Sequence, residues 1–130
     1  MKEKSVETQI IMFLRYQGFW VQKVHSGMMK KSYAYRRGER RGAERSHWIH
    51  LADQGTPDLL ACIHGKFVAI EVKKDAKEIA KWERTAETDQ RSAAQHAQQE
   101  NIRQAGGITL VCCSVEEVEA DLRELGFINA

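Results

Sequence analysis

The fold is decided by the stretch PDLLACIHGKFVAIEVKK, which runs from Pro57 to Lys74. Two apolar runs rich in β-forming residues, Leu59 to Ile63 and Phe67 to Val72, flank the dipeptide His64-Gly65. Glycine at the second position of a two-residue loop suits a type I′ turn, so the stretch predicts a β-hairpin. Because apolar residues occupy both faces of the two strands, we expect them at the centre of a covered sheet.

The register of this hairpin brings two carboxylates together. If Ile63 pairs with Lys66, Asp58 lies directly opposite Glu71, with their Cβ atoms about 4.5–5.5 Å apart on one face. Lys73 projects on that same face, because side chains alternate along a strand. Two facing carboxylates repel each other and lose hydration, so the arrangement persists only with a shared proton or a bound cation.

Two interpretations of this cluster follow from the residues alone. Carboxylate oxygens favour Mg²⁺ or Mn²⁺, and a lysine beside such an ion can orient an attacking water while the ion stabilises charge on a phosphate. In the alternative, Asp58 caps a turn after Pro57, and Glu71 pairs with Lys73 or Lys74 with no ion bound. The pattern leaves both interpretations open.

Helix and strand patterns surround the hairpin. Ser5 is a plausible N-cap, Gly106-Gly107 ends a helix, and Ser114 with Glu117 forms a capping box. We expect, in chain order, a helix over 5–17, strands over 19–24 and 47–51, the hairpin, a solvent-facing helix over 75–90, a helix over 91–105, a strand over 108–113 and a helix over 114–125. This order predicts a mixed α/β sandwich, in which the three tryptophans serve packing or an interface.

Two polar residues lie beside apolar helix faces. The neighbours of Glu7 three, four and seven positions on are Ile10, Ile11 and Leu14, so its carboxylate flanks the apolar stripe rather than the wet face. Gln95 has a similar place near the apolar side of the helix over 91–105. Both are therefore candidates for a role other than solvation.

Composition indicates a soluble globular protein. The 130 residues are 42% hydrophobic and 29% charged, with a net charge of +2. The apolar run Ile10 to Leu14 is too short for a secretory signal or a membrane span, so we expect a cytoplasmic protein. Three cysteines, two of them adjacent, with no Cys-x-x-Cys pair, argue against a disulfide framework and a structural zinc site.

A basic segment lies at about residues 28–47. Its cationic residues face only Glu39 and Glu44, and they are Lys30, Lys31, Arg36, Arg37, Arg40, Arg41 and Arg45. Interleaved tyrosines and glycines suit a flexible arm or hairpin laid against a phosphate backbone, and we predict that this segment binds DNA. The alternative is a solvated loop or tail.

These motifs together resemble a known family. Pro57-Asp58, twelve residues and then Glu71-Val72-Lys73 match the pattern of the PD-(D/E)XK nuclease superfamily. More narrowly, the chain resembles a VRR-NUC (virus-type replication-repair nuclease) domain through His25-Ser26-Gly27, Gly55-Thr56-Pro57-Asp58-Leu59, Phe67-Val68-Ala69-Ile70-Glu71-Val72-Lys73, Gln95, Gly106-Gly107 and Ser114-Val115-Glu116-Glu117. The segment between Lys74 and Gln95 is longer than the family pattern, and Ser92-Ala93-Ala94 replaces the usual Thr-Pro-Leu before the glutamine.

The resemblance implies a role for each matching residue. Asp58 and Glu71 would bind the metal, with the carbonyl of Val72 as a further ligand. Lys73 would be the catalytic lysine. The acidic residue of the N-terminal helix would be Glu7, and the helix glutamine would be Gln95, so that the catalytic set is Glu7, Asp58, Glu71, Lys73 and Gln95.

The resemblance also implies a fold and an activity. We expect one VRR-NUC-like domain over residues 1–130, with a restriction-endonuclease-like mixed sheet flanked by helices. The expected activity is Mg²⁺- or Mn²⁺-dependent hydrolysis of phosphodiesters in branched DNA. Standalone members resemble homodimeric Holliday-junction resolvases of DNA repair and recombination, so this is the preferred substrate, in a bacterial cell or a phage-infected host cell.

Three other functions stay open at this point. A flap, nicking or restriction-like nuclease would use the same chemistry. An accessory protein could bind DNA without cutting it, although such a binder would not need Asp58, Glu71 and Lys73 together. A metal-binding protein with no nucleic-acid partner fits the basic segment poorly.

Overall fold

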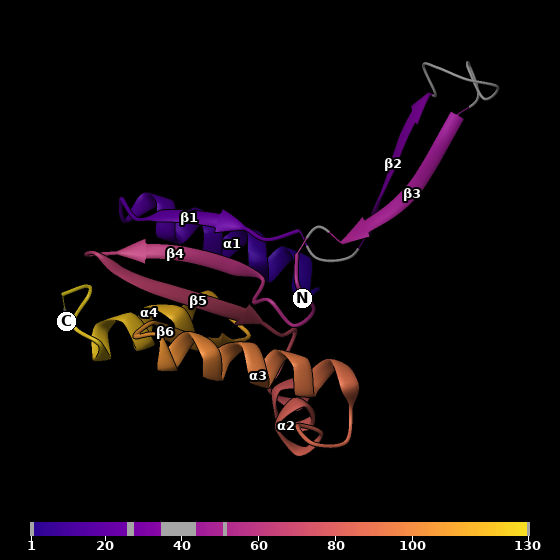
Figure 1. Cartoon of the computed structure of the whole chain (residues 1–130). Helices are drawn as coiled ribbons and strands as arrows, with labels where there is room; N and C mark the ends of the chain where they lie inside the picture. Colours follow the sequence, from indigo (N-terminus) through magenta and orange to yellow (C-terminus); the bar gives the residue numbers. More distant parts are fainter. Residues whose placement is uncertain (1, 26–27, 35–43, 51, 130) are drawn as a thin grey trace.

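A computed structural model describes residues 2–25, 28–34, 44–50 and 52–129, and for 28–34 and 44–50 it describes the backbone alone. The elements in chain order are α1 (Glu3–Tyr16), β1 (Trp20–Lys23), β2 (Met28–Ala34), β3 (Glu44–His50), β4 (Leu59–Ile63), β5 (Lys66–Val72), α2 (Ala76–Arg84), α3 (Gln90–Gln104), β6 (Ile108–Cys112) and α4 (Val115–Glu124). Figure 1 shows their arrangement.

The central sheet has the strand order β1-β4-β5-β6. β4 is antiparallel to β1 and β5, whereas β5 and β6 run parallel. The predicted hairpin is confirmed: Ile63 pairs with Lys66 and Leu59 with Ile70. His64 and Gly65 have φ angles of 50° and 78°, as a type I′ turn requires. The register therefore leads to Asp58 and Glu71 at the same edge of the sheet.

Helices cover both faces of this sheet. The core side packs against α1 and α4, and α3 lies over the other face beside β6 (Figure 1). Alternate residues of β4, Leu59, Ala61 and Ile63, are completely buried on the core side. Asp58 precedes Leu59, so alternation places it on the opposite face, the one that α3 covers.

The described parts of the basic segment belong to a separate two-stranded sheet. β2 and β3 pair antiparallel from Met28 with His50 to Ala34 with Glu44. The sequence pattern predicted one strand over 47–51, so the pair of longer strands is a correction. β2 follows β1, and β3 precedes β4. The pair is therefore connected to the core at the edge of the sheet where Asp58 lies, and Figure 1 shows it standing away from the central sheet.

One helix start and one capping contact differ from the sequence-based expectation. α1 begins at Glu3 instead of Ser5, because the Ser5 N–H already donates to the Lys2 carbonyl at 3.0 Å. The Ser114 hydroxyl accepts from the Glu117 N–H as predicted, at 3.2 Å. The Glu117 carboxylate, however, accepts from the Cys113 N–H instead of completing the capping box.

The segment over 75–90 was predicted to be a solvent-facing helix, and this is wrong in part. α2 is shorter, and its Trp82 side chain is only 7% exposed. The neighbouring α3 turns polar residues inward, namely Ser92, Gln95 and Gln99. Ser92 and Gln95 are hydrogen-bonded to residues at α2, whereas the Gln99 Nε2 has no hydrogen-bond partner in the described part of the chain, so polar side chains take the place of an apolar stripe here. None of the described helices has the length and apolarity needed to cross a membrane.

Candidate metal and catalytic centre

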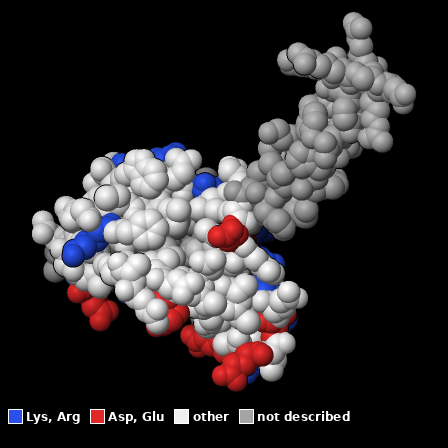
Figure 2. Space-filling view, viewed as in Figure 1, with Lys and Arg blue, Asp and Glu red and all other residues white. Residues whose placement is uncertain are grey.

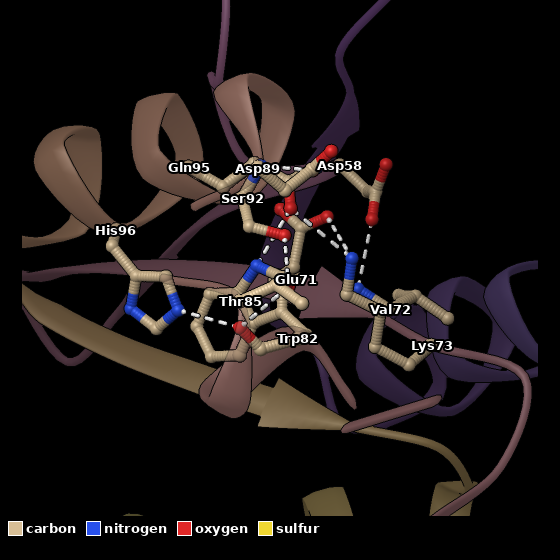
Figure 3. Close-up of polar contacts among 10 residues, drawn as sticks. All are labelled: Asp58, Glu71, Val72, Lys73, Trp82, Thr85, Asp89, Ser92, Gln95 and His96. Atoms are coloured by element: carbon tan, nitrogen blue, oxygen red, sulfur yellow. Dashed lines mark hydrogen bonds and ion pairs between the residues drawn. The ribbon is translucent and has the colours of Figure 1, made fainter. Parts of the chain in front are cut away.

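The edge where β4 begins and β5 ends holds two carboxylates. Asp58 follows the buried Pro57, and its Oδ2 accepts a hydrogen bond of 2.8 Å from the backbone N–H of Val72 (Figure 3). This bond ties the start of β4 to the end of β5, one residue beyond Glu71. The alternative in which Asp58 caps its own turn is not the contact found here.

Glu71 is the buried member of the pair. Its side chain is 2% exposed, and its Oε2 has no hydrogen-bond partner in the described part of the chain. Its Oε1 lies 3.6 Å from the Lys73 ammonium. Burial raises the pKa of Glu71 to about 8, and the negative charge of Asp58 acts in the same direction. The surroundings of Glu71 therefore favour its protonated form over the charged carboxylate.

A divalent cation fits this donor set. A buried carboxylate oxygen without a hydrogen-bond partner, beside a second carboxylate, is a donor set that a hard cation would satisfy. Within the described residues no three Asp, Glu, His or Cys side chains cluster around one point. Asp58 and Glu71 would therefore need further oxygen ligands, such as the predicted Val72 carbonyl and water.

The lysine of the centre is held by an amide. Lys73 is 6% exposed, and its Nζ donates to the Gln95 Oε1 at 3.1 Å. The Trp82 Nε1 donates to that same oxygen at 2.7 Å, and the Lys73 Nζ lies 5.6 Å from the centre of the indole ring. Two donors thus fix the orientation of the Gln95 amide, and the amide fixes the ammonium beside Glu71 (Figure 3).

Trp82 is itself positioned by His96. The two rings stack with centroids 3.6 Å apart, and His96 Nε2 lies 3.2 Å from the Trp82 carbonyl oxygen. Sequence reasoning assigned Trp82 to packing or an interface and did not connect it with Lys73. No local pattern reveals this connection, because it runs through Gln95. Gln95 lies on α3, and the turn after α2 brings it against Trp82.

A glycine couples the start of β4 to α3. Gly55 has a φ of +86°, and a Cβ placed on it would lie 2.3 Å from the Ala94 carbonyl oxygen and 2.7 Å from the Gln95 nitrogen. Any side chain here would displace the backbone of α3. The loop that leads to Asp58 therefore rests directly on the turn of helix that carries Gln95.

Two glutamates of α1 take different positions. The predicted site residue Glu7 is buried, and its Oε1 lies 2.8 Å from the ammonium of Lys23 at the end of β1. Glu3, one turn earlier, was not predicted. Partial burial raises its pKa, and the charges of Asp58 and Glu78 add to this effect. Glu3 is thus the residue of α1 that feels the charge of the centre.

Three of the seven predicted DNA-binding residues lie on the second sheet. Lys30 and Lys31 belong to β2, and Arg45 belongs to β3. The remaining ones, Arg36, Arg37, Arg40 and Arg41, lie outside the described residues. The β2–β3 pair joins the core at the end of the sheet where the two carboxylates lie, because β1 ends at Lys23 opposite Leu59.

Comparison with known proteins agrees with this architecture. The structure is similar to a solved structure described as a VRR_NUC domain, with a TM-score of 0.54 and 22% sequence identity over 94% of each chain. No protein-family model matches the sequence, and no curated protein matches it. The predicted fold class, a mixed sheet flanked by helices, is confirmed. The chain has the α/β fold of a VRR_NUC domain.

Proposed function

We propose that this protein is a divalent-metal-dependent endodeoxyribonuclease of the PD-(D/E)XK type. The observation that carries the proposal is the meeting of three groups at one sheet edge: the Asp58 carboxylate, the buried Glu71 carboxylate with its partnerless oxygen, and the Lys73 ammonium. The similarity to a VRR_NUC domain supports it, because that fold is shared over nearly the whole chain.

Each residue has a distinct task in this proposal. Asp58 and Glu71, with the carbonyl of Val72, would hold Mg²⁺ or Mn²⁺. When bound, the ion would supply stabilisation of the charge that develops on the phosphate. Lys73 would orient the attacking water through its ammonium, and Gln95 holds that ammonium at 3.1 Å. Glu7 would complete the polar wall on the α1 side.

The substrate that we propose is branched DNA. A four-way junction is the preferred form, cleaved by a homodimer because two symmetric cuts need two active sites. The basic segment over 28–47 would contact the arms of such a substrate through its phosphates. Flap, nicking or restriction-like cleavage would use the same centre. A non-cleaving accessory protein is less favoured, because it has no need for Lys73 held beside two carboxylates.

Cleavage of a panel of labelled DNAs tests this proposal. Junction, flap, splayed and duplex DNAs are incubated with the protein in Mg²⁺, Mn²⁺ or EDTA. We expect cleavage of a branched form with either metal and none in EDTA. Asp58→Ala and Glu71→Ala should each lose cleavage while DNA binding is retained or strengthened, because a negative charge facing the phosphate is removed. Full Mg²⁺-dependent activity in either variant would refute the proposed centre.

A further inference from the structure

A cleft between α2 and α3 opens directly from the proposed centre. Its volume is about 800 Å³, and its lining includes Lys73 together with Trp82 and Gln95, the two residues that hold this lysine in place. The cleft therefore begins at the proposed catalytic lysine and continues along α2.

The cleft is basic. Six cationic residues line it, namely Lys73, Lys74, Lys77, Lys81, Arg84 and Arg91. Three acidic residues also do so, and two of them are engaged as N-caps: Asp75 accepts from the Glu78 N–H at 2.8 Å, and Asp89 accepts from the Ser92 N–H at 2.9 Å. Figure 2 shows acidic and basic side chains close together around this end of the molecule. The charge that a ligand in the cleft meets is therefore set by the residues that line the cleft.

The cations of α2 form an ordered row. Lys77, Lys81 and Arg84 are spaced four and three residues apart, which places them on one stripe of the helix. They are exposed, and none of the three forms an ion pair within the described part of the chain. Successive positive charges along a groove match the successive phosphates of a polynucleotide.

The size of the cleft restricts the form of the polynucleotide. A volume of about 800 Å³ is that of a pocket for a small ligand, so it can hold a short length of one strand but not a duplex. We propose that the α2–α3 cleft binds the sugar-phosphate backbone of an unpaired DNA strand next to the scissile phosphate. This inference rests on the proposed nuclease function, and among the branched forms it favours those with an unpaired strand at the cleavage site, such as a flap or splayed DNA, over the fully paired four-way junction.

Binding without cleavage tests the cleft directly. The variant is Lys77→Gln with Lys81→Gln, and the matched control is Arg15→Gln with Lys66→Gln. The control removes the same charge from exposed positions at the opposite edge of the sheet. Fluorescence anisotropy in EDTA measures affinity for a blunt duplex and for the same duplex with a single-stranded arm, over a series of salt concentrations.

We expect the parent to bind the armed DNA more tightly than the blunt duplex. The cleft variant should lose that preference, and its slope of log K against log[salt] on armed DNA should fall by about 1.4, or ~0.7 for each single-strand contact. Its affinity for the blunt duplex should equal that of the control variant. A second variant, Lys77→Arg with Lys81→Arg, should restore the slope because it restores the charge.

The experiments distinguish failure of the cleft proposal from failure of the nuclease proposal. Equal slopes in the cleft and control variants, equal loss on both DNAs, or a parent with no preference for the arm would overturn the cleft proposal. Cleavage of the DNA panel could still stand in each of these cases. If no DNA is cleaved but the preference is lost in the cleft variant alone, the cleft stands and the nuclease proposal fails.

Discussion

The hairpin β4–β5 and the helical segment α2–α3 build the same centre by different means. The hairpin is apolar and held by a strand ladder, and it carries Asp58, Glu71 and Lys73 on its edge. The helical segment is charged, and it buries Trp82 and Gln95 through hydrogen bonds. The hairpin thus supplies the groups that would do the chemistry, whereas the helices set the position of the lysine.

The largest change is expected on the hairpin side, at the lysine. Lys73→Ala should lower the cleavage rate by about a hundredfold to ten-thousandfold, the range for loss of a positioned group that handles the nucleophile. Metal binding should persist, because the two carboxylates remain. Single-turnover cleavage and calorimetry on the same preparation measure both. Loss of metal affinity in this variant would make Lys73 a structural partner of Glu71 instead.

The next effect concerns the charge on Glu71 in the metal-free protein. The folded state raises the pKa of this carboxyl from 4.5 to about 8, so folding favours its protonated form. The associated stability is fully present below about pH 4.5 and is lost as the pH rises through 8, by an amount on the order of a few kcal/mol. Urea unfolding in EDTA at pH 5 and pH 8 should show this loss.

Glu71→Gln serves as the reference for that titration. The amide keeps the shape of the side chain but does not ionise, so the unfolding free energy of the variant should change less with pH than that of the parent. Saturating Mg²⁺ should also reduce the loss in the parent, since the cation compensates the charge. If the unfolding free energies of the parent and the variant depended on pH in the same way, Glu71 would not be the residue responsible for the loss of stability.

A smaller effect is expected on the helical side, at Trp82. Trp82→Phe keeps an aromatic ring against His96 but removes the N–H that holds the Gln95 oxygen. We expect kcat to fall about tenfold to a hundredfold, the usual cost of losing a partner that orients a site residue, with KM for DNA unchanged. Trp20→Phe, the same replacement at a 58% exposed position, is the control and should leave kcat unchanged.

The result at Trp82 separates orientation from packing. If Trp82→Phe also raises KM or lowers stability more than Trp20→Phe does, its role is packing. In that case the division of tasks between hairpin and helices would not hold. A pH profile of kcat that shifts in Trp82→Phe alone would instead confirm that the indole acts through Lys73.

The two regions also differ in how well their structure follows from sequence. The register of the hairpin could be predicted to the residue, because the two-residue turn His64-Gly65 between two apolar runs specifies one pairing. The burial of Trp82 and Gln95 could not, because their partners lie on another helix and no apolar stripe marks the contact. The same limit applies to Gly55, because neither its positive φ nor the approach of the Ala94 carbonyl is visible in the local sequence.

The smallest effect is expected at Glu7. Glu7→Gln preserves shape and hydrogen bonding and removes one charge that Lys23 already compensates. If Glu7 belongs to the centre, cleavage should fall by less than about tenfold, with little change in the free energy of unfolding. Cleavage at the parent rate would assign Glu7 to its pair with Lys23 alone, and would direct attention to Glu3, the acidic residue of α1 whose pKa the charge of Asp58 raises.

Direct measurement of metal binding tests the central claim. Mn²⁺ is titrated into the protein at pH 7 by calorimetry, in two buffers with different heats of ionisation, for the parent and for Asp58→Asn and Glu71→Gln. We predict saturable binding by the parent with release of a proton, because Glu71 with a pKa of about 8 must ionise to accept the cation. Binding should be lost in both variants. Equal affinity in the parent and the two variants would contradict the account.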